Sequence, residues 1–272
     1  MASNQASWKL FGVPLSQPFR SVAWVLLQHK IPFECILTVP GTTTKIGSRS
    51  PDYLKKSRTG RVPLLEDPDG FVVAESPAIL SHLCERFGTS SSWYGLPGSH
   101  KKATIDSYMH WHHHGTRNLA RVAFPYLRPE DANKFTNNAD QDRKKAMQAL
   151  RDLEDGWFTD EDAPYLAGFS EPSIADLLAY EEVVQLTGLG LLVPSLMHQE
   201  YPRLYEWTQR MSNLPFHEQV HVSLYTLGDV TKSTNGDIPF AKRLGAATKA
   251  GLKALVEAQS DYVESGPLQS KL

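Results

Sequence analysis

The sequence predicts an α+β domain followed by an all-helical domain, and three observations support this fold class. An apolar run from Trp8 to Val13 is followed by a turn and by helical spacing, which predicts a strand, a turn and a helix. Two further apolar runs flank the turn sequence Asp67–Gly70 and predict a hairpin that leads into another helix. After a linker at residues 88–99, apolar residues repeat at helical spacing from Lys101 onward.

Ser16 lies just before the first predicted helix, which has Pro18 in its first turn. There its hydroxyl can donate a hydrogen bond to an anion, and the free N–H groups of the first turn and the helix dipole add to the attraction. A free thiol with a pKa near 8.5 is roughly 3% ionised at pH 7, and lowering that pKa by about two units, or about 2.7 kcal/mol, makes the thiolate the majority species. Ser16 is therefore a candidate donor to a bound thiolate, and an ordinary helix cap is the alternative.

Glu75 and Ser76 form a second polar group, at the start of the helix that follows the hairpin. We expect Ser76 to be the N-cap, with Pro77 as the first helical residue. This corner suits the end of an α-amino acid, with the ammonium on Glu75 and the carboxylate on Ser76. Val62 precedes a proline, so its extended backbone offers an N–H and a C=O to a bound peptide. The sequence does not decide whether the bond to Pro63 is cis or trans.

Composition and charge exclude several classes of protein. The 272 residues are 41% hydrophobic and 21% charged, which suits a soluble globular chain of one or two domains, and we expect two. A net charge of −2 leaves no electrostatic footprint for nucleic acid. The N-terminus has no signal-peptide pattern, and no apolar stretch is long enough to span a membrane. Cys35 and Cys84 form no C-x-x-C pattern, which excludes a disulfide framework and a thioredoxin-type dithiol centre.

Two patterns in the helical half have structural explanations. On a helix, Asp106, His110 and His114 would share one stripe, but three ligands on one stripe rarely converge on one ion, and no H-E-x-x-H pattern accompanies them. We therefore expect no metal site, and histidines that pack or face solvent. Ser173 and Asp176 form a capping box, which we interpret as the start of a helix.

These motifs belong to an ordered set of segments, which are Leu15–Arg20, Ile31–Glu34, Val62–Pro63 and Glu75–Leu80. The set resembles the N-terminal domain of theta-class glutathione S-transferases. Trp111–His113 with Arg117, and later Pro172–Leu177, are similar to landmarks of that family's helical domain. The resemblance implies a thioredoxin-like βαβ–ββα domain at residues 8–88, an all-helical electrophile-binding domain at residues 100–230, and a C-terminal extension at residues 231–272.

The resemblance also implies roles for individual residues. Ser16 would stabilise the thiolate of glutathione, which attacks a small hydrophobic electrophile. The implied glutathione contacts are Gln17, Lys45, Arg61, Val62, Pro63, Glu75, Ser76 and Arg117. Lys45 or Thr44 stands about where the family carries a histidine, and Arg61 stands where it often carries a lysine. Glutathione would be a co-substrate with no further cofactor, and the protein is expected to form a homodimer.

Two other functions fit the same fold. The first is a catalytically silent module used in protein interactions, although such a module has no chemical reason to keep both Ser16 and the Glu75–Ser76 pair. The second is a thiol–disulfide reductase, which would need a cysteine where Ser16 stands.

The C-terminal residues predict a further helix and a targeting signal. Residues 239–258 are expected to form a helix that either covers the electrophile pocket, as in theta-like proteins, or packs against the surface. The last residues, Ser270, Lys271 and Leu272, are the tripeptide that peroxisomal import receptors read. We therefore expect a peroxisomal location, and otherwise a cytoplasmic one. Because peroxisomes generate hydroperoxides, reduction of organic hydroperoxides is an expected second activity.

Overall fold

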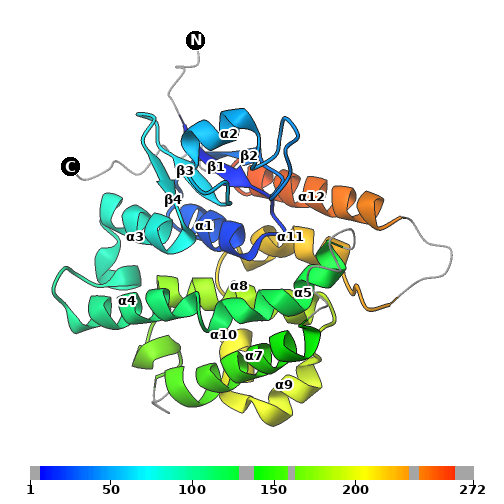
Figure 1. Ribbon diagram of the computed structural model, residues 1–272. Helices are drawn as coiled ribbons and strands as arrows, with labels where there is room; N and C mark the ends of the chain where they lie inside the picture. The colour runs from blue at the N-terminus through cyan, green and yellow to red at the C-terminus, as the bar shows by residue number, and fades with distance from the viewer. Residues whose placement is uncertain (1–6, 129–137, 159–162, 233–238, 261–272) are drawn as a thin grey trace. The chain divides into compact units, whose positions relative to one another are not determined.

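A computed structural model describes residues 7–128, 138–158, 163–232 and 239–260 (Figure 1). These residues form two compact units. The first unit contains the described residues up to 88, together with 215–223 and 245–260, and the second contains those of 89–214 and 224–244. Two segments from the C-terminal part of the chain thus belong to the first unit. The tripeptide Ser270–Leu272 lies outside the described residues.

The first unit has a four-stranded mixed sheet with the strand order β2-β1-β3-β4. Its strands are β1 (Trp8–Gly12), β2 (Phe33–Leu37), β3 (Leu64–Glu66) and β4 (Val72–Ala74). β1 and β2 run parallel, whereas β1 with β3 and β3 with β4 run antiparallel. The predicted thioredoxin-like βαβ–ββα fold is confirmed.

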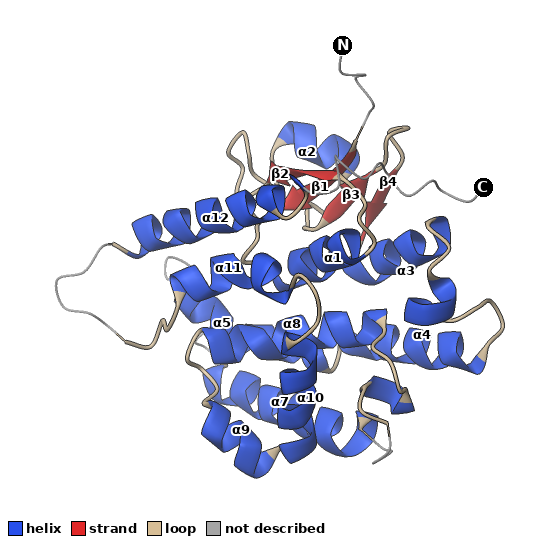
Figure 2. Ribbon diagram, turned by 180° about the vertical axis from the view of Figure 1, so that it is seen from behind, coloured by secondary structure: helices blue, strands red, loops and turns tan. Residues whose placement is uncertain are grey.

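Helices cover both faces of this sheet (Figure 2). They are α1 (Gln17–Gln28), α2 (Pro51–Lys56) and α3 (Ser76–Arg86). α1 and α3 lie on one face and α2 lies on the other. Phe11, Tyr53 and Leu64 form the core under α2, because Phe11 and Leu64 are paired on neighbouring strands and Tyr53 projects from the helix.

The C-terminal segments of the first unit are tied to its sheet and to α1. They come from α11 (His217–Leu227) and α12 (Phe240–Glu257), so the helix predicted over residues 239–258 is present. Trp24 of α1 donates its indole N–H to the Pro215 carbonyl over 2.8 Å. Just beyond α12, the Gln259 side-chain oxygen accepts the Phe33 N–H over 2.8 Å, at the edge strand β2. Whether α12 covers an electrophile pocket stays a prediction.

The second unit is built from helices, as predicted. They include α4 (His100–His112), α5 (Leu119–Leu127), α7 (Ala139–Arg151), α8 (Ile174–Gly188), α9 (Pro194–Glu200) and α10 (Pro202–Ser212). α8 is buried along nearly its whole length, as expected of a central helix. The capping box is confirmed, because the Asp176 carboxylate accepts the Ser173 N–H over 2.8 Å and the Ser173 hydroxyl accepts the Ala175 N–H over 3.2 Å.

The helical segment predicted from Lys101 onward is interrupted near Gly115. α4 ends at His112, and a short helical turn at Thr116–Asn118 precedes α5. A Cβ on Gly115 would lie 2.2 Å from the Trp111 ring, so the indole packs directly over the glycine where the chain turns. His114 is therefore outside α4 and does not continue the predicted stripe. The described residues contain no group of three His, Cys, Asp or Glu that could hold a metal ion, and none of their helices is long and apolar enough to cross a bilayer.

Candidate active site

Most of the predicted site residues lie in segments that adjoin the same end of strands β1, β3 and β4. Phe11 of β1 pairs with Leu64 of β3, which pairs in turn with Ala74 of β4. The segments that continue from this row are the loop with Ser16, the Val62–Pro63 peptide and the Glu75–Ser76 corner. Because neighbouring strands lie about 4.8 Å apart, these three segments begin within the length of one small ligand.

Ser16 is the N-cap residue of α1, with an extended backbone at φ −79° and ψ 122°. Its carbonyl accepts the N–H groups of Phe19 and Arg20 over 3.1 and 3.0 Å. In the described structure the Ser16 hydroxyl makes no capping hydrogen bond, and the residue is half-buried. The hydroxyl is therefore not used as an ordinary side-chain cap and is left to a ligand or solvent.

Gln17 follows at the first position of α1 and is only 4% exposed. Its amide nitrogen has no hydrogen-bond partner among the described residues. An unsatisfied buried donor costs roughly 1–3 kcal/mol. A ligand acceptor beside Gln17 would remove this penalty.

The corner before α3 differs by one residue from the prediction. Glu75, and not Ser76, is the N-cap, and Ser76 is the first helical residue. Glu75 has φ +69° and ψ 117°, a conformation that costs a residue other than glycine about 1–3 kcal/mol and is concentrated at functional sites. The Glu75 carboxylate is exposed, while Ser76 is buried and its hydroxyl bonds to no other described residue.

The Val62–Pro63 peptide bond is cis, which the sequence alone did not decide. Within the described chain, neither the N–H nor the C=O of Val62 is paired with a protein group. The preceding residue is anchored, because the Tyr53 hydroxyl donates to the Arg61 carbonyl over 2.6 Å. The Arg61 side chain itself is exposed. Val62 thus keeps a free backbone donor and acceptor beside β3.

Lys45 lies in the loop after β2, and its side chain is exposed. Ser48 holds this loop in place: its hydroxyl donates to the Gly60 carbonyl over 2.8 Å and accepts the Gly41 N–H over 2.8 Å. Ser48 is fully buried, and sequence reasoning missed it because an isolated serine in a loop has no periodic signal. The loop with Lys45 is therefore anchored close to the segment that leads to Val62.

Arg117 belongs to the second unit, where its guanidinium bonds to a buried carboxylate. Arg117 Nη1 lies 2.6 Å from Glu182 Oε1, and the Glu182 side chain is fully buried. His112 Nε2 lies 3.6 Å from the same oxygen. Burial first, and then the charges of Arg117 and His113, hold the pKa of His112 well below its usual value, so its ring is neutral at pH 7. Arg117 thus has a structural role, and its contact with glutathione stays a prediction.

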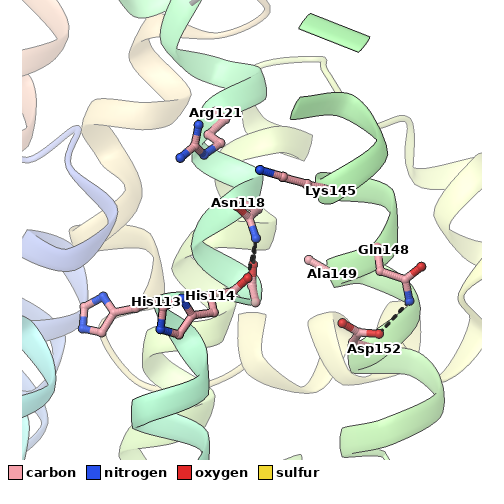
Figure 3. Close-up of a pocket in the computed structure, with 9 residues that line it drawn as sticks. His113, His114, Asn118, Arg121, Lys145, Gln148, Ala149 and Asp152 are labelled. Atoms are coloured by element: carbon pink, nitrogen blue, oxygen red, sulfur yellow. Dashed lines mark hydrogen bonds between the residues drawn. The ribbon is translucent and has the colours of Figure 1, made fainter. Parts of the chain in front are cut away.

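A hollow of about 340 Å³ lies in the second unit, between the segment from His113 to Arg121 and helix α7 (Figure 3). It is lined by His113, His114, Gly115, Asn118, Arg121, Lys145, Gln148, Ala149 and Asp152. None of the predicted glutathione contacts lines it. Several of its polar groups bond to the protein, since Asn118 donates to the Gly115 carbonyl over 3.0 Å and Gln148 donates to Asp152 over 2.8 Å. We assign no function to this hollow.

The two cysteines do not form a reactive centre. Burial, and then the neighbouring Glu34 carboxylate, raise the pKa of Cys35 to about 12, so its thiol is protonated at neutral pH. Cys84 is fully buried. These surroundings argue against the thiol–disulfide reductase considered from the sequence.

Sequence reasoning assigned no role to two residues next to the Ser16 loop. Arg20 is 1% exposed, and its guanidinium donates to the Leu15 carbonyl over 3.0 Å. A Cβ on Gly251 of α12 would lie 2.8 Å from Pro14 Cβ. The only sequence signal for Arg20 was a cation inside an otherwise apolar helix, and Gly251 gave none.

Comparison with known proteins identifies the family. Residues 10–91 match the family model "Glutathione S-transferase, N-terminal domain", and residues 118–215 match "Glutathione S-transferase, C-terminal domain". The chain belongs to the glutathione S-transferase family. The two matched segments contain every predicted site residue except Arg117, which immediately precedes the second segment.

The similar proteins include members of the theta class, as the resemblance implied. A dichloromethane dehalogenase from Methylorubrum extorquens is 30% identical over 268 residues, covering 92% of this chain and 89% of the relative. Human glutathione S-transferase theta-2 is 31% identical over 207 residues, covering 75% and 80%. The crystal structure of human glutathione transferase theta-2 with glutathione and an unknown ligand superposes with a TM-score of 0.65 at 25% identity, covering 93% and 100% of the two chains.

Proposed function

We propose that this glutathione transferase uses the Ser16 hydroxyl to stabilise the glutathione thiolate for attack on organic electrophiles. The observation that carries the proposal is the row Phe11–Leu64–Ala74, from which three sets of ligand-binding groups continue. The row spans two strand spacings, or roughly 10 Å. An extended tripeptide is of similar length, roughly 10 Å.

Each set of groups suits one part of glutathione. The exposed Glu75 carboxylate pairs with the ammonium of the γ-glutamyl end, and the Ser76 hydroxyl with the first N–H groups of α3 donates to its carboxylate. The free N–H and C=O of Val62 pair with the cysteinyl backbone as a strand would. Gln17 donates its amide near the sulfur end. The cations Lys45 and Arg61 supply positive charge for the glycine carboxylate.

Ser16 acts on the sulfur without losing its own proton. The thiol proton leaves to solvent, and the hydroxyl donates a hydrogen bond that is stronger to the thiolate than to the thiol. The positive end of α1 adds to this preference. The sulfur then forms a bond to an electrophilic carbon, and the leaving group departs with the electron pair of the broken bond. Because a dichloromethane dehalogenase is among the relatives, we include small haloalkanes among the proposed electrophiles.

The ionisation of bound glutathione tests this function. Its ultraviolet thiolate band is titrated with the wild-type protein, with Ser16→Ala, and with Ser21→Ala as a matched control. Ser21 is a buried serine of α1 whose hydroxyl donates to the Pro18 carbonyl over 3.0 Å. We expect a wild-type thiol pKa about two units below 8.5, a rise of about 1–2 units in Ser16→Ala, and no change in Ser21→Ala. An unshifted thiol in the wild type would instead support the catalytically silent module.

A second proposed activity is the reduction of organic hydroperoxides. The thiolate attacks a peroxide oxygen, the O–O bond breaks, and the alcohol leaves after taking up a proton, so that glutathione becomes a sulfenic acid. A second glutathione thiol then displaces water and yields the disulfide. The sequence Ser270–Leu272 favours this activity, because it predicts a compartment that produces peroxides.

Import is tested by locating an N-terminally tagged full chain and the same chain without these three residues. We also propose a homodimer, which sedimentation would test.

A further inference from the structure

Arg20 is a buried cation in the first turns of α1. It is 1% exposed, and its Nη1 donates to the Leu15 carbonyl over 3.0 Å and to the Pro14 carbonyl over 3.4 Å. Burying a guanidinium is unfavourable unless hydrogen bonds compensate for its lost hydration. Both of these acceptors belong to the loop immediately before Ser16. The side chain therefore ties the first turns of the helix to the backbone of the loop.

The same loop is held at two further points. A Cβ on Gly12 would lie 2.5 Å from the Phe19 ring, so this ring packs directly on the loop where it leaves β1. Pro14 contacts α12, since a Cβ on Gly251 would lie 2.8 Å from Pro14 Cβ. The backbone from Gly12 to Leu15 is thus fixed by contacts with α1 and α12, and Ser16 follows it directly.

We propose that Arg20 is a positioning residue for the thiolate donor: by fixing the Pro14 and Leu15 carbonyls it orients the Ser16 hydroxyl toward the sulfur of glutathione. This inference rests on the function proposed above, because Arg20 acts only through Ser16. Its positive charge also reaches the loop from inside the protein and favours a negative sulfur over a neutral one. Both effects lower the pKa of the bound thiol, while neither is needed for binding the peptide part of glutathione.

Two substitutions separate the geometry from the charge. Arg20→Lys keeps the charge, but its side chain is one bond shorter, so the ammonium does not reach the position from which Nη1 donates to the Pro14 and Leu15 carbonyls. Arg20→Met removes both the charge and the hydrogen bonds. Arg203→Met is the matched control, because Arg203 Nη1 also donates to a backbone carbonyl, that of Phe158, over 3.0 Å, but within the second unit.

The experiment measures two quantities on the full chain. The first is the pKa of the bound glutathione thiol, from its ultraviolet thiolate band. The second is the dissociation constant of S-methylglutathione, which has no ionisable thiol. We expect the thiol pKa to rise by about one unit in Arg20→Met and by a smaller amount in Arg20→Lys. The affinity for S-methylglutathione should stay within about two-fold of the wild type, and Arg203→Met should change neither quantity.

An unchanged thiol pKa in folded Arg20→Lys and Arg20→Met overturns the inference. An affinity loss for S-methylglutathione without a pKa change also overturns it, because Arg20 would then be merely structural. If circular dichroism shows that Arg20→Met is unfolded, the thiol pKa of Arg20→Lys decides whether the inference holds. The function itself fails in a different way: the wild type would then show an ordinary thiol pKa, or Ser16→Ala would match the wild type.

Discussion

Replacing Gly251 with alanine tests whether α12 packs against the loop that precedes Ser16. In an ordinary helix interior, glycine to alanine stabilises by about 0.5–1 kcal/mol. Here the new Cβ would lie 2.6 Å from Ser223 Cβ and 2.8 Å from Pro14 Cβ, well inside the optimal carbon–carbon separation of about 3.5–4 Å. Overpacking of this kind costs about 1–3 kcal/mol. The net expectation for Gly251→Ala is therefore a loss of about 1 kcal/mol.

The same helix supplies a matched control. A Cβ on Gly245 would meet no described atom of another segment within 4 Å, so Gly245→Ala should stabilise by about 0.5–1 kcal/mol. Thermal unfolding of the two variants should then shift in opposite directions, by about 2–4 °C per kcal/mol. If Gly251→Ala raises the unfolding temperature as much as Gly245→Ala does, α12 is not packed against Pro14 and does not hold the loop before Ser16.

Three further predictions concern charge and strain. Glu75→Gly should stabilise the protein by about 1 kcal/mol in thermal unfolding, because glycine adopts φ +69° freely. The same substitution should weaken S-methylglutathione binding about ten-fold in calorimetric titration. A loss of stability would show that the backbone at Glu75 is not strained. Arg117→Met should lower the free energy of unfolding in urea by about 1–3 kcal/mol, because it removes the cation that lies 2.6 Å from the buried Glu182 carboxylate. The loss stays in this range because the Arg117 side chain is 32% exposed and solvent screens the pair. Adding Glu182→Gln should recover part of the loss. The pKa of His112 is lowered in the folded state, so the unfolded chain takes up a proton at this residue more readily than the folded protein does. The stability that the neutral ring contributes is therefore complete above the unfolded pKa of 6.5 and is lost as pH falls below it. His112→Gln should reduce this dependence by up to about 1.4 kcal/mol per pH unit in denaturant titrations, and equal slopes would refute the assignment.

Three of the four strands and most helices of the first unit could be predicted because their signals are local. The apolar run at Trp8–Val13 and the turn at Asp67–Gly70 carry their own signals, and β1, β3 and β4 form where these signals place them. α2 was not predicted, since its six residues hold a single buried side chain, Tyr53, and show no helical repeat. The break after His112 was also missed, because the contact between Trp111 and Gly115 that accompanies it cannot be read from spacing.

The candidate site shows the same division between local and long-range information. Ser16 was predicted from its place before a helix, which is a local property. The N-cap at Glu75 was missed by one residue, because a positive φ at a glutamate runs against the usual preference for Ser at that position. The anchoring roles of Ser48 and Gly251 depend on segments 12 or more residues away. No window of the sequence contains both partners of such contacts.

The proposed donor role of Ser16 depends on the conformation of its loop more than a backbone N–H donor would. The Ser16 hydroxyl sits on a side chain with three staggered rotamers, and only some of them can direct it at a given sulfur. Since no capping bond selects one, the choice depends on where the backbone places Cβ. The backbone before Ser16 is held by the hydrogen bonds of Arg20 to the Pro14 and Leu15 carbonyls and by the packing of Gly251 against Pro14. Substitutions at Arg20 and Gly251 act on one shared loop, so their effects on the thiol pKa should not be additive.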